Sequence, residues 1–192
     1  MNKPIVIQGK YLHMYFSYVN SVKSGEYSGC INTDDTQYKD TKKIVVKTNR
    51  TCKVYFHSHP PLGNEKEIDH YIQPPSDYDI ITFIDDYLAG KMTHMLVFSP
   101  DGVYCIYIGK KKDNLLILHD SIPEQDFKDI IKDQASKYLE ERDNLMHKHT
   151  KRTASKFGHK LSDHANDFFT MVNIDFYNWP KKLDDGLEIN SK

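Results

Sequence analysis

The sequence predicts an α/β protein, with a core of strands and helices over residues 1–120 and a mostly helical C-terminal extension over residues 121–192 that packs on the core. Two observations predict this arrangement. In the first part of the chain, segments with helical spacing of apolar residues alternate with short runs of β-branched and aromatic residues, which is typical of an α/β fold. From Pro123 onward the composition changes, and charged segments with helical spacing predominate.

The first third of the chain is predicted to contain one helix and several short strands. Residues 11–22 carry apolar groups at helical spacing, and Gly25 follows closely as a helix breaker. A short strand is expected around residues 29–31, and the polar residues 32–42 are expected to form a loop. The runs at 44–46 and 54–56 flank a turn-like segment, so we expect them to pair as two strands.

The middle of the chain is predicted to hold a loop, a helix and two strands. Residues 60–75 are polar and contain several prolines, as a loop does. Residues 77–88 have helical spacing, and Gly90 is well placed to end that helix. Residues 95–98 and 103–108 are apolar runs on either side of Ser-Pro-Asp-Gly, a sequence typical of a turn.

The remaining residues are predicted to be mainly helical. We expect a hairpin turn at 110–113 and a further strand at 115–118. Pro123 suits the first turn of a long charged helix over 124–147, and a second helix is expected near 161–170. Apolar and polar residues alternate over 172–176, as in a final strand, and Trp179 is expected to anchor the tail on the core.

Charge and composition argue against several classes of protein. The formal net charge is −1, so no global field draws the chain to nucleic acid or to an anionic membrane. The three cysteines include no C-x-x-C pair, which argues against a disulfide framework and a cysteine-ligated zinc site. No stretch approaches the roughly 20 apolar residues that span a bilayer. We therefore expect a soluble, intracellular, cytoplasmic protein that binds neither nucleic acid nor membrane; its oligomeric state stays open.

His57 and His59 stand two residues apart at the end of a predicted strand. Side chains at this spacing point to the same face, so both imidazoles can reach one metal ion. Catalytic zinc usually has three protein ligands, which leaves a fourth position open to water. Asp79 is the candidate third ligand, and the set predicts one zinc ion (Zn2+) per chain. The alternative is that the two histidines are surface residues near a strand end.

Ser76 and Asp79 also have a structural interpretation. Ser-x-x-Asp at the start of a helical segment is the pattern of a capping box, with Ser76 at the N-cap. The two interpretations are compatible, because a capped first turn is a rigid place from which to direct a carboxylate at a metal ion. Glu26 taken alone is an ordinary solvated charge, but it lies between the first helix and a strand, where a base can overhang the metal.

Together these residues resemble the signature of the JAMM (MPN+) zinc metalloproteases, which is a distant upstream Glu, then His-[Ser/Thr]-His-Pro, then Ser-x-x-Asp. The run from Glu26 to Gly29 is similar to the Glu-x-x-Gly that follows the family's first helix. The run from Pro75 to Asp79 is similar to the family's Pro-Ser-x-x-Asp. The resemblance covers about residues 5–118 and implies a cytidine-deaminase-like MPN core, with a curved mixed β-sheet flanked by helices.

The chain departs from the family pattern between His59 and Asp79, where it has nineteen residues and most members have fewer. The extra residues fall in the loop, so we expect an insertion at 61–74 beside the metal. His70 lies in this insertion and is either a further ligand or a solvated loop residue. A basic segment further on is either a second metal or contact site or a solvated turn between helices, and it contains His147, His149, His159 and His164.

The resemblance implies a role for each residue of the signature. His57, His59 and Asp79 would hold zinc, which lowers the pKa of a bound water toward ~7. Glu26 would take and return the proton, and Ser76 would hydrogen-bond the oxyanion. Family members mostly hydrolyse isopeptide bonds, so we expect a deubiquitinase-like isopeptidase whose partners are conjugates of ubiquitin or a ubiquitin-like protein. The alternatives are a non-catalytic MPN scaffold and a zinc hydrolase of a different amide.

Overall fold

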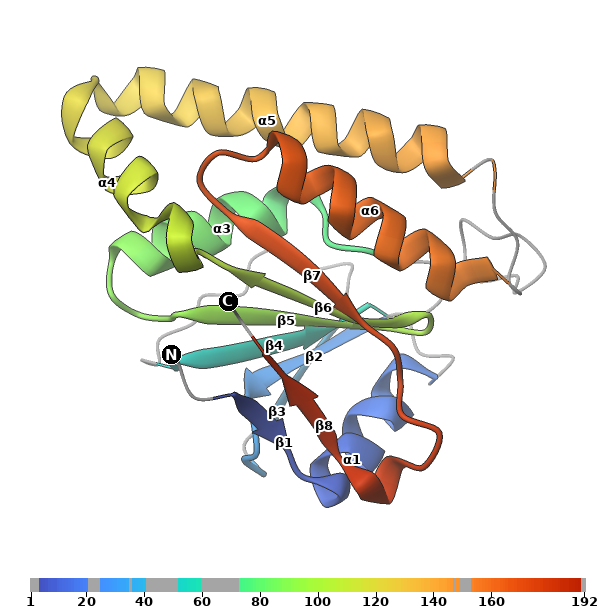
Figure 1. The fold of residues 1–192 in the computed structure, drawn as a ribbon. Coiled ribbons are helices and arrows are strands. Elements are labelled where there is room, and N and C mark those ends of the chain that lie inside the picture. Colours follow the sequence, from blue (N-terminus) through green and yellow to red (C-terminus); the bar gives the residue numbers. More distant parts are fainter. Residues whose placement is uncertain are drawn as a thin grey trace.

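A computed structural model describes residues 4–20, 25–34, 36–40, 52–59, 73–146, 148 and 153–190, and its main feature is a mixed sheet of six strands (Figure 1). In sheet order the strands are β3 (Thr36–Asp40), β2 (Gly25–Cys30), β4 (Val54–Ser58), β5 (His94–Ser99), β6 (Gly102–Tyr107) and β7 (Asn173–Tyr177). β4 and β5 are parallel, and the other neighbouring pairs are antiparallel. The protein therefore has the mixed α/β architecture that the sequence predicts.

Helices cover both faces of this sheet (Figure 1). One face is covered by α1 (Gly9–Val19) and by a two-stranded sheet of β1 (Ile5–Ile7) and β8 (Leu187–Ile189). The opposite face is covered by α3 (Asp77–Leu88), α5 (Glu124–Met146) and α6 (Ala154–Phe168). The short helices η1 (Gly109–Lys111) and α4 (Lys112–Ser121) connect β6 to α5, and η3 (Leu183–Asp185) precedes β8.

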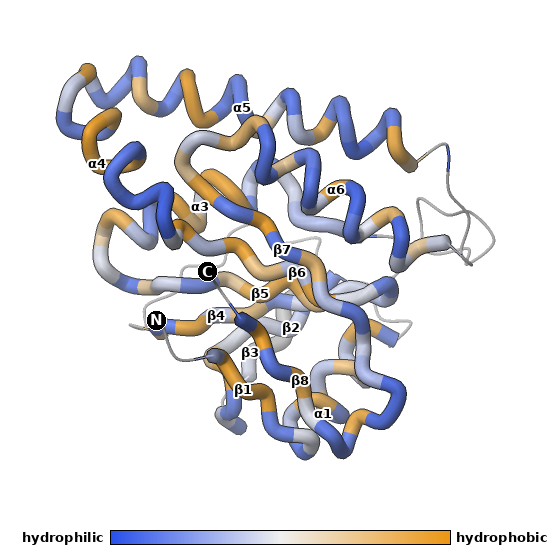
Figure 2. Tube along the Cα trace, in the orientation of Figure 1, coloured by the Kyte–Doolittle hydropathy of each residue, from blue (hydrophilic) through white to orange (hydrophobic). Residues whose placement is uncertain are grey.

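The central strands bury side chains on both of their faces. In β5, Met95 and Val97 belong to the core beneath α3, α5 and α6, whereas Leu96 and Phe98 belong to the core beneath α1. Figure 2 shows hydrophobic residues concentrated along these strands. Burial on both faces explains why β5 and β6 are continuous apolar runs in the sequence and do not alternate with polar residues.

Helix α3 is the crossover between the parallel strands β4 and β5. A parallel connection carries the chain from the carboxyl end of one strand back to the amino end of the next, and a helix usually makes this return. The helix therefore begins near the carboxyl end of β4, and His59 is the first residue after this strand. This topology brings Asp79, in the first turn of α3, close to His57 and His59 despite the intervening loop.

Several predicted elements are confirmed. The helix predicted at 77–88 is α3 with the same bounds, and Gly90 follows it at φ +68, a conformation favoured after helix ends. The predicted strands at 95–98 and 103–108 correspond to β5 and β6, and the alternating tail contains β7. The two C-terminal helices are α5 and α6, although α6 begins at Ala154, earlier than expected.

Three local predictions are wrong. Residues 36–40, expected in a loop, form β3, because an edge strand pairs through its backbone and does not need an apolar run. Residues 115–118, expected as a strand, lie in α4; the run is leucine-rich, and leucine is a strong helix former. The residues expected as a hairpin turn, 110–113, belong to η1 and the start of α4. The run 44–46 lies outside the described residues, and its expected partner β4 pairs with β2 and β5.

Cys30 at the end of β2 and Cys52 just before β4 form a disulfide in the structure. The cysteine content argues against a framework of several disulfides, and a single bond is not such a framework. The sequence did not predict this pair. Cys105 is a free, buried cysteine in β6.

The C-terminal part of the chain contributes one strand to each of the two sheets. β7 pairs with β6, and β8 pairs with β1 at the other end of the chain. The predicted anchoring of the tail by Trp179 is confirmed, since its Nε1 donates to the Ser99 carbonyl at 2.9 Å and its ring stacks on Phe98. The division of the chain at residue 120 stays a prediction.

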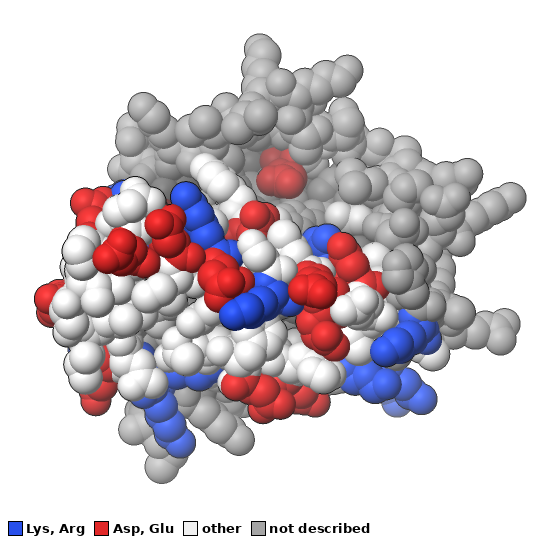
Figure 3. Space-filling view, turned by 90° about the horizontal axis from the view of Figure 1, so that it is seen from above, with Lys and Arg blue, Asp and Glu red and all other residues white. Residues whose placement is uncertain are grey.

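The face formed by α5 carries charges of both signs (Figure 3). Lys128 pairs with Glu124, and Lys137 pairs with Asp133, one turn apart on the helix. Such pairs are typical of a solvated helix face. None of the helices among the described residues combines the length and the apolar composition that a membrane span requires.

Candidate metal centre

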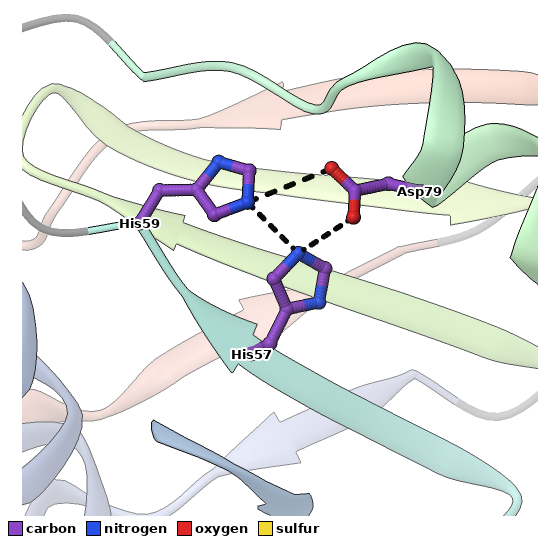
Figure 4. Close-up of side chains that lie close together, drawn as sticks. All are labelled: His57, His59 and Asp79. Carbon is purple, nitrogen blue, oxygen red and sulfur yellow. Dashed lines mark hydrogen bonds and ion pairs between the residues drawn. The ribbon is translucent and has the colours of Figure 1, made fainter. Parts of the chain in front are cut away.

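His57 and His59 lie at the carboxyl end of β4 and direct their rings to the same side (Figure 4). Within the sheet, His57 is paired with Ser28 of β2 and with Val97 of β5, so its backbone is fixed on both sides. The His59 amide donates to the Phe98 carbonyl at 2.7 Å, which continues the pairing with β5 one residue past the strand. The predicted convergence of the two rings follows from this extended backbone.

Asp79 reaches the histidines from the first turn of α3. The predicted capping box is present: the Ser76 hydroxyl accepts the Asp79 N–H at 3.2 Å, and Asp79 Oδ2 accepts the Ser76 N–H at 2.7 Å. The Ser76 hydroxyl also donates to Asp79 Oδ2, at 2.8 Å. These bonds hold the carboxylate in one orientation, and Oδ1 is left directed at His57. Capping and metal binding are therefore compatible, as expected.

The three side chains converge closely enough to hold one metal ion. Nε2 of His57 lies 3.0 Å from Nε2 of His59 and 3.1 Å from Asp79 Oδ1, and Nε2 of His59 lies 3.5 Å from Asp79 Oδ2 (Figure 4). Ligand atoms at the vertices of a tetrahedral zinc site are about 3.3 Å apart, given ligand distances of about 2.0–2.1 Å. The observed separations lie on both sides of this value, so the donor set fits such an ion.

The orientation of the His59 ring is set by a backbone group. Nδ1 of His59 lies 3.1 Å from the carbonyl oxygen of Gln73. A carbonyl only accepts hydrogen bonds, so Nδ1 carries the proton and, in the neutral ring, the lone pair of Nε2 faces His57 and Asp79. Histidines that bind metal ions commonly donate their second N–H in this way.

Asp79 and His57 shift each other's pKa. Burial disfavours the charged form of His57, but the Asp79 carboxylate and its hydrogen bond outweigh burial and raise the pKa of His57. Burial also disfavours the Asp79 carboxylate, but His57, His59 and the Ser76 amide outweigh it and lower the pKa of Asp79. An ionised Asp79 is ready to act as a ligand, whereas His57 must release a proton to do so, and metal affinity should therefore rise with pH.

Glu26 lies on the same face of the sheet as His57 and His59, beside the group that they form with Asp79. Ser28 is opposite His57 in the antiparallel pair of β2 and β4, so two residues further Glu26 comes opposite His59. Glu26 Oε1 lies 4.0 Å from His59 Nε2, and the Glu26 side chain is 37% exposed whereas that of His59 is 13% exposed. A carboxylate at the open side of the group can exchange protons with solvent and with a substrate.

The structure thus brings together all five residues that the sequence singled out. Sequence reasoning missed a group behind them, in which Gln73 contacts His59 and Ser99, and Ser99 contacts Asp101. Ser99 and Asp101 were assigned only to a turn, because Ser-Pro-Asp-Gly has a strong turn signal of its own.

Of the other histidines that the sequence singled out, the structure describes His159 and His164, and both lie outside this group. His70, His147 and His149 lie outside the described residues. His159 contacts Asn178, and His164 lies 3.8 Å from Glu141. In the described part of the chain, the group that can hold a metal ion is His57, His59 and Asp79.

Comparison with known proteins found no family model, no curated protein and no solved structure that matches the chain. The site is therefore characterised by its own geometry, which is a buried group of two imidazoles and a carboxylate that can hold a metal ion.

Proposed function

We propose that this protein is a zinc-dependent hydrolase of isopeptide bonds, of the kind that the JAMM-type resemblance implies, and that it removes ubiquitin or a ubiquitin-like protein from lysine. One observation carries the proposal: His57, His59 and Asp79 converge, and Glu26 lies 4.0 Å from one of these ligand atoms at the more exposed side. Ligands and a base in this relation are what metal-assisted hydrolysis requires.

The donor set favours zinc over the common hard cations. Magnesium and calcium prefer oxygen ligands throughout, whereas two imidazoles and a carboxylate, with a position left for water, are typical of catalytic zinc. Non-haem iron uses a similar donor set, so elemental analysis is needed to identify the metal. Bound zinc would polarise the amide carbonyl and lower the pKa of a water toward ~7.

Glu26 and Ser76 are the chain's own candidates for proton transfer and charge stabilisation. Glu26 would accept a proton from the attacking water and deliver it to the leaving lysine amine, which its partial exposure permits. Ser76 would donate its hydroxyl proton to the oxyanion of the tetrahedral intermediate. In the structure the Ser76 hydroxyl donates this proton to Asp79 Oδ2. To stabilise the oxyanion, the hydroxyl must turn away from Asp79 and donate to the oxyanion instead.

The choice of substrate rests on the motif resemblance. The site geometry bears on the kind of bond that is broken and does not distinguish between the proteins joined by that bond. The same resemblance disfavours the non-catalytic scaffold, since such MPN modules characteristically lose one of the site residues. Here Glu26, His57, His59, Ser76 and Asp79 are all present and lie together.

The proposal is tested by metal content and by cleavage of a panel of ubiquitin and ubiquitin-like conjugates, with a chelator control. We expect about one zinc per chain. Glu26→Gln should keep the zinc and the melting temperature but lose about 10²–10⁴ in rate, because the amide cannot accept the proton. Glu141→Gln is the matched control, since Glu141 also lies near a histidine, His164, outside the site. Wild-type rate in Glu26→Gln would contradict the mechanism.

Two further outcomes separate the alternatives. A zinc-loaded protein that binds conjugates and cleaves none would be a scaffold. A protein that leaves all conjugates intact but hydrolyses small amides would be a zinc hydrolase with a different substrate.

A further inference from the structure

A chain of buried polar groups lies behind the metal site, at the turn between β5 and β6. Ser99 is fully buried and Asp101 is 8% exposed, and the Ser99 hydroxyl donates to Asp101 Oδ1 at 2.5 Å. Tyr104, also fully buried, donates its hydroxyl to Asp101 Oδ2 at 2.7 Å. Both carboxylate oxygens of Asp101 therefore accept a hydrogen bond from an uncharged hydroxyl.

This chain reaches the metal site through the backbone of Gln73. The Gln73 N–H donates to Ser99 Oγ at 3.1 Å, and the Gln73 carbonyl accepts from His59 Nδ1 at 3.1 Å. The next two residues, Pro74 and Pro75, have no N–H. The Gln73 amide is therefore the last backbone donor that can fix the chain before Ser76 caps α3.

The direction of these hydrogen bonds is set by Asp101. An ionised carboxylate only accepts, so the Ser99 proton points at Asp101 and a lone pair of Ser99 Oγ is left for the Gln73 N–H. Gln73 is then held in place to accept the His59 Nδ1 proton, and this leaves His59 Nε2 free to bind a metal ion.

We propose that Ser99 and Asp101 are positioning residues for the metal site, because they hold Gln73 where it fixes the tautomer and orientation of His59. This inference rests on the proposed zinc site. An asparagine at position 101 has the size of aspartate, but its side chain has one acceptor oxygen and one donor nitrogen. It cannot accept from both Ser99 and Tyr104, so one of the two hydrogen bonds is lost or reversed.

The test compares Ser99→Ala and Asp101→Asn with a control on the opposite face of β6. There the Tyr107 hydroxyl donates to Asp175 Oδ2 at 2.8 Å, so Asp175→Asn perturbs a similar tyrosine–carboxylate pair away from the metal. Three quantities are measured, of which the first two are zinc affinity by chelator competition and hydrogen exchange of the Gln73 amide in the metal-free protein. The absorption spectrum with Co²⁺ in place of zinc reports the ligand geometry.

We expect Ser99→Ala and Asp101→Asn to bind zinc about 10–100-fold more weakly, as when groups behind metal ligands are removed. The Gln73 amide should exchange faster and the Co²⁺ spectrum should change, while Asp175→Asn leaves all three readouts as in the wild type. If Ser99→Ala does not fold, Asp101→Asn alone decides. Wild-type zinc affinity in a folded variant would overturn the positioning role, whereas a wild-type protein that binds no zinc would refute the proposed function itself.

Discussion

Ser76 has a structural and a catalytic interpretation, and the two make different predictions. Its hydroxyl accepts the Asp79 N–H and donates to Asp79 Oδ2, so it is fully used within the capping box. An oxyanion needs the same proton. The backbone N–H of Ser76 donates to the same Oδ2 at 2.7 Å, so the carboxylate keeps a donor when the hydroxyl turns to a substrate. The arrangement therefore permits both roles, and a pair of substitutions can separate them.

Alanine at an N-cap lowers stability by about 1 kcal/mol, in a range of about 0.5–2, whereas glycine lowers it by only a few tenths. In a chain of 192 residues, 1 kcal/mol corresponds to a decrease of about 2–4 °C in Tm. Loss of an oxyanion donor lowers kcat by about 10²–10³ whichever residue replaces it. We therefore expect Ser76→Ala to lose stability and rate together, and Ser76→Gly to lose the rate while retaining most of the stability.

The assay is thermal unfolding together with kcat on a cleaved conjugate, with zinc content measured for each variant. Ser76→Thr is the matched control, because it keeps a hydroxyl that can serve both roles. If Ser76→Gly cleaves as fast as the wild type, the hydroxyl acts only as a cap and the catalytic interpretation of Ser76 is refuted.

Two other predictions concern the fold around the site. A Cβ at Gly158 of α6 would lie 2.5 Å from Phe176 Cδ2, so Gly158→Ala should destabilise the protein in denaturant unfolding by about 1–3 kcal/mol, despite the better helix propensity of alanine. Phe176→Leu in the same chain should recover part of this loss; unchanged stability in Gly158→Ala would contradict the packing. Burial raises the pKa of Asp101 to about 6, so the folded state retains a proton that the unfolded state loses near pH 4. Stability should therefore fall by roughly 3 kcal/mol as pH rises from about 4 through 6, and denaturant unfolding at several pH values should show this slope in the wild type and not in Asp101→Asn.

The elements that the sequence predicted correctly are those whose signals are local. α3 has apolar spacing, an N-cap serine and a glycine beyond its end, and its predicted bounds are those observed. β5 and β6 are apolar runs around a strong turn. β3 and α4 were predicted wrongly because their signals are weak: β3 is held by backbone pairing at an edge, and in α4 only Leu115 is buried.

The convergence of His57 and His59 could be predicted because strand periodicity places them on one face. The approach of Asp79 depends on topology, because the crossover helix α3 begins near the carboxyl end of β4. The sequence indicated this approach only through the motif resemblance. Glu26 likewise depends on the register between β2 and β4. Contacts of Gln73 with His59 and with Ser99 join residues far apart in the chain and leave no local pattern to recognise.

Asp101 shows how a turn residue acquires a second role through such contacts. In Ser-Pro-Asp-Gly an asparagine would serve the turn as well, and it would avoid the roughly 3 kcal/mol that the raised pKa of a buried carboxylate implies at neutral pH. Stability alone therefore does not account for an aspartate here. What the carboxylate provides is the ability to accept two hydrogen bonds, which orients Ser99 toward it and leaves Gln73 placed for His59. In Asp101→Asn the avoided desolvation of the carboxylate and the loss of one buried hydrogen bond oppose each other in stability, whereas zinc binding should weaken. A purely structural role for Asp101 predicts instead that the folded variant binds zinc as tightly as the wild type.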